Sequence, residues 1–315
     1  MSERILRAAV IGVGHLGRHH ARILSSMAGA TLDAVVDVNE ARAREIAAGA
    51  GARALTSARE LLGQVDLVSI ATPTETHAEI ATLFLEQGTP VLVEKPLARS
   101  VGEADAIIAA AARSGAALAV GHTERFNPAV VAARSAVDNP RFIEVHRLGT
   151  FPERSLDIDV VFDLMIHDLD LVLSIVQAEA ESIEAVGVPV LTDRFDIANA
   201  RLRFASGCVA NITASRISRD RTRKIRFFQR DAYISIDTGA KEAEVYRLVR
   251  SPGRRPAIEG GKIPVRDGEP LRHELEDFVD AVRTGRAPLV GGEDGRRAVA
   301  LAAAITERMA ACTRI

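Results

Sequence analysis

The stretch AAVIGVGHLGRHHARIL, residues 8–24, decides the fold of this chain. Its first four residues are apolar and predict a buried strand, whereas RHHARIL has helical character. The glycines between them follow the spacing G-x-G-x-x-G. The first permits a tight turn, the second lets a pyrophosphate approach the backbone, and the third lets helix and strand pack closely. Free N–H groups at the helix start favour phosphate. We therefore predict a dinucleotide-binding loop that contains Gly12, Gly14, His15, Leu16 and Gly17.

A second strand-like stretch, LDAVVD, ends at Asp37, which lies 20 residues beyond Gly17. A carboxylate at this position accepts hydrogen bonds from the hydroxyls of a ribose and repels a 2′-phosphate. The predicted cofactor is therefore NAD rather than NADP. Arg42 and Arg44 follow closely, but we expect them on a solvated helix face.

Strand-like and helix-like segments alternate from residue 8 to residue 122, with later strands in VDLVSIATP, PVLVEKP and ALAVGH. Strict alternation predicts an α/β fold with a doubly wound parallel sheet, a Rossmann domain, whose ligands lie at the carboxyl ends of the strands. The residues at and just beyond these ends give further candidates. We expect cofactor contacts from Thr72, Pro73, His77, Glu94 and Lys95, and a substrate contact from His122.

Beyond residue 122, strands follow one another, as in RLRFASGCVANITASRIS and KIRFFQRDAYISIDTG. Glycine-rich and charged turns between strands predict the hairpins of a large, mostly antiparallel sheet. The length of 315 residues suits two domains. We expect an NAD-binding Rossmann domain over residues 1–121 and an α/β domain for substrate binding and oligomerisation over residues 122–315. A broad sheet with one solvated face would suit a homodimer or homotetramer.

Composition excludes several classes of protein. The net charge of −2 offers no basic field for nucleic acid. No apolar run is long enough to span a bilayer, and no secretory signal is visible at the start of the sequence. The two cysteines, Cys208 and Cys312, match no metal-ligand spacing, so we expect no metal and a reduced, cytoplasmic protein.

Three stretches, VIGVGHLGRHHARIL, IATPTETHAEIATLFLEQGTPVLVEKPLARS and VGHTERFNPA, resemble the Gfo/Idh/MocA family of sugar and cyclitol oxidoreductases. The triplet E-K-P is the most specific sign, and the resemblance extends through DLMIHDLDLVL to cover nearly the whole chain. It implies a Rossmann domain followed by an α/β domain with a large, mostly antiparallel sheet. It also implies that Lys95, and Asp163 and His167 in a D-x-x-x-H pattern, line the substrate pocket.

The chemistry of these three residues agrees with oxidation of an alcohol. Asp163 and His167 are four apart in a helical stretch, so we expect them on one face. Histidine can take a proton near neutral pH, the carboxylate can orient its ring, and Lys95 can stabilise a forming alkoxide. Whether Lys95 or His167 takes the proton stays open. The plainer interpretations are a helix cap for Asp163 and a partly buried helical residue for His167. Asp168 and Asp170 point to other faces and predict no metal site.

Within the family, GHTERFNPAV and DVVFDLMIHDLDLVLSIV resemble the branch that oxidises the 3-hydroxyl of UDP-N-acetylglucosamine, the step before transamination to a lipid A amino sugar. Arginines gather between residues 216 and 230 and form either a solvated hairpin face or a cationic lip for phosphate. Two alternatives remain: an inositol or free-sugar 2-dehydrogenase of the same family, and a non-catalytic NAD-binding sensor. With a strand starting within ten residues, no N-terminal arm is available to hold the cofactor, so we expect it to exchange. Candidate substrate contacts are Arg125, Asn127 and Arg216.

Overall fold

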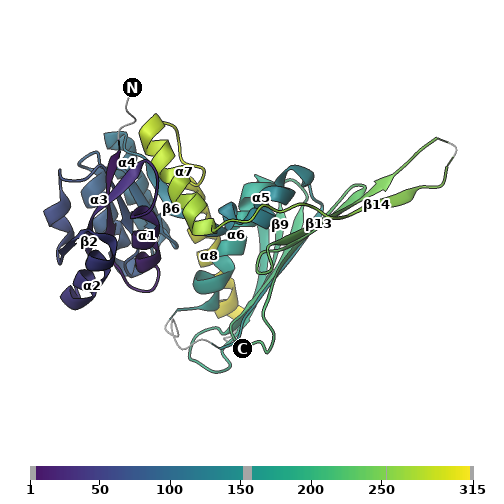
Figure 1. The fold of residues 1–315 in the computed structure, drawn as a ribbon. Helices are drawn as coiled ribbons and strands as arrows, with labels where there is room; N and C mark the ends of the chain where they lie inside the picture. Colours follow the sequence, from purple (N-terminus) through teal and green to yellow (C-terminus); the bar gives the residue numbers. More distant parts are fainter. Residues whose placement is uncertain (1–4, 152–157, 253, 313–315) are drawn as a thin grey trace. The chain divides into compact units, whose positions relative to one another are not determined.

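The computed structural model describes residues 5–151, 158–252 and 254–312 of the chain. These residues form two compact units (Figure 1). Unit 1 consists of residues 1–122 and 271–299, and unit 2 consists of residues 123–270 and 300–315.

Unit 1 contains a six-stranded parallel sheet with the strand order β3-β2-β1-β4-β5-β6. Chain order reverses between β1 and β4, which is the point where open α/β sheets bind their ligands. The strands β4, β5 and β6 are buried throughout, which explains their continuous apolar sequences. The predicted doubly wound sheet is confirmed. Its strands are β1 (Leu6–Ile11), β2 (Ala30–Val36), β3 (Arg53–Leu55), β4 (Leu67–Ile70), β5 (Val91–Glu94) and β6 (Leu118–Gly121).

Two helices of unit 1 begin and end at residues that favour helix ends. The side chains of Asn39 and Ser100 cap α2 and α4 by accepting hydrogen bonds from backbone N–H groups. The same helices end at Gly51 and Gly115, which adopt the left-handed conformation. The helices between the strands are α1 (Gly17–Leu24), α2 (Glu40–Ala50), α3 (His77–Leu85) and α4 (Val101–Ser114), with short 3₁₀ turns at Ala58–Leu61 and Thr74–Thr76.

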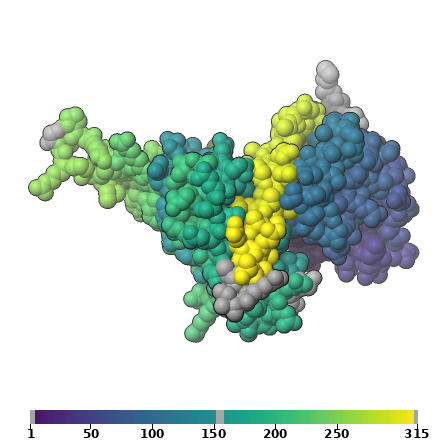
Figure 2. All heavy atoms as spheres, turned by 180° about the vertical axis from the view of Figure 1, so that it is seen from behind, coloured from purple at the N-terminus to yellow at the C-terminus, as the bar shows by residue number. Residues whose placement is uncertain are grey.

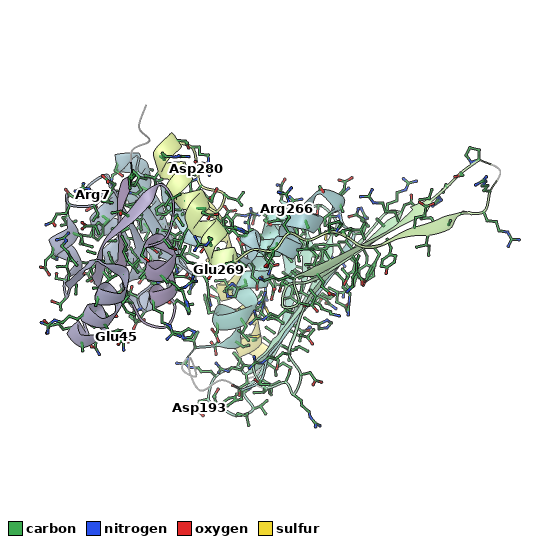
Figure 3. All side chains as sticks on the ribbon, in the orientation of Figure 1. Arg7, Glu45, Asp193, Arg266, Glu269 and Asp280 are labelled. Atoms are coloured by element: carbon green, nitrogen blue, oxygen red, sulfur yellow. The ribbon has the colours of Figure 1, made fainter. Side chains whose placement is uncertain are left out.

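A helix from the far end of the sequence completes the core of unit 1. In α7 (Pro270–Thr284), three buried apolar residues pack against the start of the Rossmann sheet and the segment before β2; they are Leu275, Phe278 and Val279. In Figure 3, Asp280 on α7 and Arg7 on β1 lie at the same end of unit 1, away from Glu45 on α2. Unit 1 therefore differs from the expected uninterrupted stretch of residues 1–121, because burying the apolar face of α7 recruits residues 271–299 to it.

Unit 2 contains an eight-stranded sheet with the order β14-β13-β12-β11-β7-β10-β9-β8, in which β7 and β10 run parallel and the other neighbours antiparallel. Buried and half-buried residues alternate along β7 and β9, so one face is covered. The β13–β14 hairpin extends beyond the rest of unit 2 (Figures 1 and 2). The strands are β7 (Phe142–Leu148), β8 (Ala180–Val188), β9 (Ile197–Phe204), β10 (Val209–Ser215), β11 (Thr222–Gln229), β12 (Ala232–Asp237), β13 (Glu242–Val249) and β14 (Ala257–Lys262).

The helical part of unit 2 contains one departure from the expected geometry. The stretch predicted as a single α-helix begins with a π-helical turn (Val161–Met165) and continues as α6 (Ile166–Val176). Such turns recur at functional sites. Unit 2 also contains two 3₁₀ turns (Thr123–Phe126 and Arg134–Ala136), α5 (Pro128–Ala133) and the end of α8 (Gly292–Cys312).

Candidate functional site

The three glycines of the loop after β1 meet different surroundings. Gly12 has φ +83°, and a Cβ there would lie 2.7 Å from the Thr72 side chain. A Cβ on Gly17 would lie 1.8 Å from the carbonyl oxygen of Gly12, so only glycine fits. A Cβ on Gly14 would meet nothing within 4 Å. The loop is thus packed where helix and strand meet and open at its middle glycine, where His15 and Leu16 are also exposed. This is the shape that a pyrophosphate requires.

Asp37 ties the end of β2 to the glycine loop. Its carboxylate accepts hydrogen bonds from the N–H groups of Val13, at 3.0 Å, and Asn39, at 2.9 Å. Arg42 is exposed on α2, as expected, and its guanidinium also lies 3.5 Å from the same carboxylate. Arg44 also lies there, paired with Glu40. The carboxylate of Asp37 therefore lies beside the glycine loop, with the guanidinium of Arg42 next to it.

Two of the candidate residues at the ends of β4 and β5 are buried and have internal partners. Both ring nitrogens of His77 contact backbone carbonyls, that of Thr72 at 2.9 Å and that of Pro96 at 3.0 Å. Glu94 contacts the ring of His20 and the N–H of Lys95. These bonds tie both residues to the loops after β4 and β5, and their role as cofactor contacts stays a prediction.

The charge of Glu94 is favoured inside the protein. Burial alone raises the pKa of Glu94, but the hydrogen bond and charge of His20, together with Lys95, outweigh it and leave the pKa below its ordinary value. Lys95, Thr72 and Pro73 reach the surface of unit 1 at least in part, and His122 is buried directly after β6. All of them follow the carboxyl ends of strands.

In unit 2, the candidate pair lies at the junction of two kinds of helix. Asp163 belongs to the π-helical turn, and His167 is the second residue of α6. Both side chains are partly exposed. The stretch predicted as one α-helix therefore changes helix type between the two residues.

Two ion pairs hold α6 just after His167, and the first of them is buried. Arg147 of β7 donates hydrogen bonds to both oxygens of Asp168, at 2.7 and 2.8 Å, and a third to Glu124 at 3.0 Å. Burial raises the pKa of Asp168, and Arg147 opposes this shift. Burial also lowers the pKa of Arg147, but the two carboxylates outweigh it and raise the pKa, so the guanidinium stays charged. Arg125 pairs with both oxygens of Asp170, at 2.6 and 2.9 Å.

Three predicted substrate contacts have structural partners instead. Arg125 holds Asp170, as described above. Asn127 caps α5 and donates to the carbonyl oxygen of Thr238. Arg216 is 1% exposed and donates to Asp196, at 2.9 Å, to Thr192 and to the carbonyl oxygen of Ile158. These contacts hold α6, the start of α5 and the loop after β8.

The arginine-rich stretch divides between the two faces of the sheet. Arg223 pairs in register with Arg147, so both lie on the helix-covered face, and Arg223 is exposed there. Arg221 is exposed two residues earlier and contacts Thr150. Arg226 lies on the opposite face, paired with Glu144 at 2.5 Å. The helix-covered face thus presents one exposed guanidinium group near α6, that of Arg223, whose charge also acts on Asp168.

Sequence reasoning missed several supporting residues: His20, Ser69, Glu124 and Arg147. One signal was present in the sequence. Asp168 is a charged residue inside an apolar helix, and such a residue needs a buried cation as its partner. The described residues contain no group of three or more His, Cys, Asp or Glu that suits a metal ion. Cys208 is a buried free thiol, and the side chain of Cys312 is outside the described part. No helix in the described ranges has an apolar stretch long enough to cross a bilayer.

Comparison with known proteins gives two matches to family models. Residues 6–122 match the model "Oxidoreductase family, NAD-binding Rossmann fold", and residues 129–235 match "GFO/IDH/MocA C-terminal domain". The open middle glycine and the carboxylate after β2 fit the dinucleotide that the first description names.

Two relatives and one solved structure align along nearly their full lengths. UDP-N-acetylglucosamine 3-dehydrogenase of Acidithiobacillus ferrooxidans is 42% identical over 309 residues, 97% of each chain. Inositol 2-dehydrogenase of Rhizobium meliloti is 30% identical over 329 aligned positions, again 97% of each. A solved structure of UDP-N-acetylglucosamine 3-dehydrogenase from Acidithiobacillus ferrooxidans has a TM-score of 0.91 at 40% identity and covers 97% of this chain and 98% of its own.

Proposed function

Because the chain belongs to the Gfo/Idh/MocA family of NAD-dependent oxidoreductases, we propose that it oxidises the 3-hydroxyl of UDP-N-acetylglucosamine to a ketone. The observation that carries this proposal is the full-length likeness to UDP-N-acetylglucosamine 3-dehydrogenase, at 42% identity. The inositol 2-dehydrogenase, at 30%, is a more distant relative over the same length.

The proposed chemistry gives each of three residues one task. Bound NAD supplies the acceptor for hydride. His167 is the candidate group for the proton of the hydroxyl, and Asp163 orients its ring and stabilises its charged form. Lys95 donates a hydrogen bond to the reacting oxygen and offsets negative charge as it develops.

The diphosphate of the substrate has candidate partners in unit 2. Arg223 is exposed on the helix-covered face of the sheet, and Arg221 is exposed just before β11 begins. The planar guanidinium group of arginine suits phosphate oxygens. These residues replace Arg125, Asn127 and Arg216 as the substrate contacts that we propose. An inositol has no phosphate, so this feature supports the nucleotide sugar over the inositol alternative.

The experiment is a substrate comparison with purified protein. NADH formation is measured with UDP-N-acetylglucosamine, UDP-glucose and myo-inositol, and the product is identified by NMR as the 3-keto sugar. We expect kcat/KM to be highest for UDP-N-acetylglucosamine. A preference for myo-inositol would replace the proposal with the inositol reaction. The absence of turnover with every sugar, while NAD still binds, would favour the sensor.

The assignment of roles is tested on the same substrate. Lys95→Met and His167→Phe remove the proton-transfer and hydrogen-bonding groups with little loss of bulk. Each should lower kcat by roughly a hundredfold or more while the Kd for NAD stays within about threefold. Lys224→Met is a matched control, because Lys224 is on the sheet of unit 2, 3.9 Å from Asp237. Near-normal rates in both site variants would contradict the assignment.

The setting of the reaction completes the proposal. The 3-keto product suits a transaminase that makes a 3-amino sugar for lipid A. We propose the cytoplasm as the location of the enzyme, because nucleotide sugars and NAD are available there. The half-buried face of the eight-stranded sheet offers a surface for a homodimer or homotetramer. Sedimentation of the purified protein measures the oligomeric state.

A further inference from the structure

Both chain neighbours of Lys95 are bonded to a buried histidine. Oε1 of Glu94 lies 3.0 Å from Nε2 of His20, and the carbonyl oxygen of Pro96 lies 3.0 Å from Nδ1 of His77. His20 and His77 are 0% and 1% exposed. Because neither ring reaches the surface, neither can contact a substrate. Any effect of the two rings on the reaction must therefore act through the residues that they contact.

The contacts of His20 join three elements of unit 1. Its Nδ1 lies 2.8 Å from the hydroxyl of Ser69 on β4, and its Nε2 contacts Glu94 at the end of β5, while His20 itself is on α1. The other carboxylate oxygen of Glu94 accepts the N–H of Lys95 at 3.1 Å. Glu94 thus links the ring of His20 to the backbone of Lys95.

The carboxylate of Glu94 has little room to move. A Cβ built on Gly121 of β6 would lie 3.0 Å from the Glu94 side chain, so the neighbouring strand closes this side. Ser69 is fully buried, and Glu94 nearly so. Breaking one bond of such a network leaves a buried polar group without a partner, which is costly.

His77 provides the second attachment. Its Nε2 lies 2.9 Å from the carbonyl oxygen of Thr72, in the loop after β4, and its Nδ1 contacts Pro96 in the loop after β5. One ring therefore bridges the loops that flank the proposed cofactor site. Together, the two histidines restrain the backbone on either side of Lys95.

We propose that His20 and His77 are positioning residues for Lys95: His20 acts through Glu94 and His77 through Pro96. The inference deepens the proposed function, because it rests on the catalytic task assigned to Lys95. A lysine side chain has a long flexible stem, so the position of its ammonium depends on a fixed backbone. A displacement of about 1 Å at a reacting group costs roughly a hundredfold in rate.

The test uses two matched pairs of substitutions. The amide nitrogen of glutamine approximates the position of Nε2, and that of asparagine approximates Nδ1. His20→Gln keeps a donor toward Glu94, whereas His20→Asn keeps only a partner for Ser69. For His77 the order reverses, because Asn preserves the contact to Pro96 and Gln preserves the contact to Thr72. We expect His20→Gln and His77→Asn to be active. We expect His20→Asn and His77→Gln to be impaired.

Two readouts separate positioning from general damage. In the impaired variants, kcat with UDP-N-acetylglucosamine should fall by roughly tenfold or more, while KM and the Kd for NAD stay within about threefold. In the protein without NAD, hydrogen exchange of the segment from Val91 to Leu97 should accelerate in the impaired variants only. A purely structural role would lower stability without this reversed ranking.

The outcomes decide the inference independently of the substrate. Equal kcat in all four variants overturns the inference, and so do equal rates of hydrogen exchange in all four. If the wild type does not oxidise UDP-N-acetylglucosamine, the proposed substrate is wrong. The variants are then ranked by hydrogen exchange and by kcat on the sugar that is oxidised. If no sugar is oxidised at all, the catalytic task of Lys95 fails, and the inference is overturned with it. If His20→Asn does not fold, the His77 pair decides.

Discussion

The guanidinium of Arg147 donates two hydrogen bonds to Asp168, and both side chains are buried within unit 2. Asp168 follows His167 directly in α6, so this ion pair fixes the helix next to the proposed proton acceptor. The third bond of Arg147, to Glu124, connects the same cation to the 3₁₀ turn before α5. The pair is therefore a structural requirement for the helix that carries His167.

Removal of Arg147 should be among the most damaging changes in unit 2. Arg147→Met leaves two carboxylates without their cation, and the free energy of unfolding should fall by about 3–5 kcal/mol. Urea denaturation followed by circular dichroism measures the loss. Arg226→Gln breaks a partly exposed pair on the opposite face and should cost about 1 kcal/mol or less. Equal losses in the two variants would contradict this account.

The glycines of the loop should separate folding from cofactor binding. Gly17→Ala places a Cβ 1.8 Å from a backbone oxygen, so the melting temperature should fall sharply. Gly14→Ala meets no protein atom within 4 Å, so the melting temperature should stay unchanged while the Kd for NAD rises by roughly tenfold or more. Calorimetry and NAD titration make the comparison. Unaltered NAD affinity in Gly14→Ala would argue against pyrophosphate at this loop.

Asp37 should decide between the two dinucleotides. Asp37→Asn removes the charge that repels a 2′-phosphate and leaves Arg42 close to it. The ratio of kcat/KM for NAD to that for NADP should fall by roughly tenfold, or about 1.4 kcal/mol. Arg44→Ala, on the solvated face beside Glu40, should leave the ratio unchanged. A constant ratio in both variants would show that Asp37 does not discriminate.

Two arginines of β11 should differ in their effect on substrate. Arg223→Gln removes an exposed cation from the helix-covered face, so KM for UDP-N-acetylglucosamine should rise by roughly tenfold. Arg226→Gln removes a cation from the other face and should leave KM as in the wild type. Initial rates at saturating NAD measure both. If Arg226→Gln raises KM as much, the diphosphate does not bind where we propose.

Acid should destabilise the loop after β8 through Asp196. Burial raises the pKa of Asp196, but hydrogen bonds from the N–H groups of Leu191, Val190 and Thr192 outweigh it and lower the pKa well below its ordinary value. A carboxyl with a depressed folded pKa stabilises the fold above its unfolded pKa and loses this effect as pH falls through the folded pKa.

The stability advantage of the wild type over Asp196→Asn should therefore shrink between about pH 5 and pH 2. Urea titrations across this range measure it. Asp193→Asn, at an exposed position of the same loop, provides the control (Figure 3). An advantage that stays constant with pH would show that the charge of Asp196 does not stabilise the loop.

Local sequence determined the Rossmann sheet, its glycine loop and the alternation of its strands and helices. These features follow from short-range rules, since glycine spacing, apolar runs and helix caps act within a few residues. For the same reason the position of Lys95 at a strand end, and of Asp37 after the second strand, could be derived before any coordinates. The antiparallel sheet was likewise predictable from successive strands and turns.

Only the tertiary structure decided which charges are paired and which are exposed. Arg125 and Arg216 looked like substrate contacts in the sequence, yet they pair with Asp170 and Asp196, which are 45 and 20 residues away. Arg223 and Arg226 look alike in the sequence, but strand register places them on opposite faces. The recruitment of α7 to unit 1 has the same cause. Partners distant along the chain are chosen by burial, because a buried charge or apolar face needs whatever surface the fold brings to it.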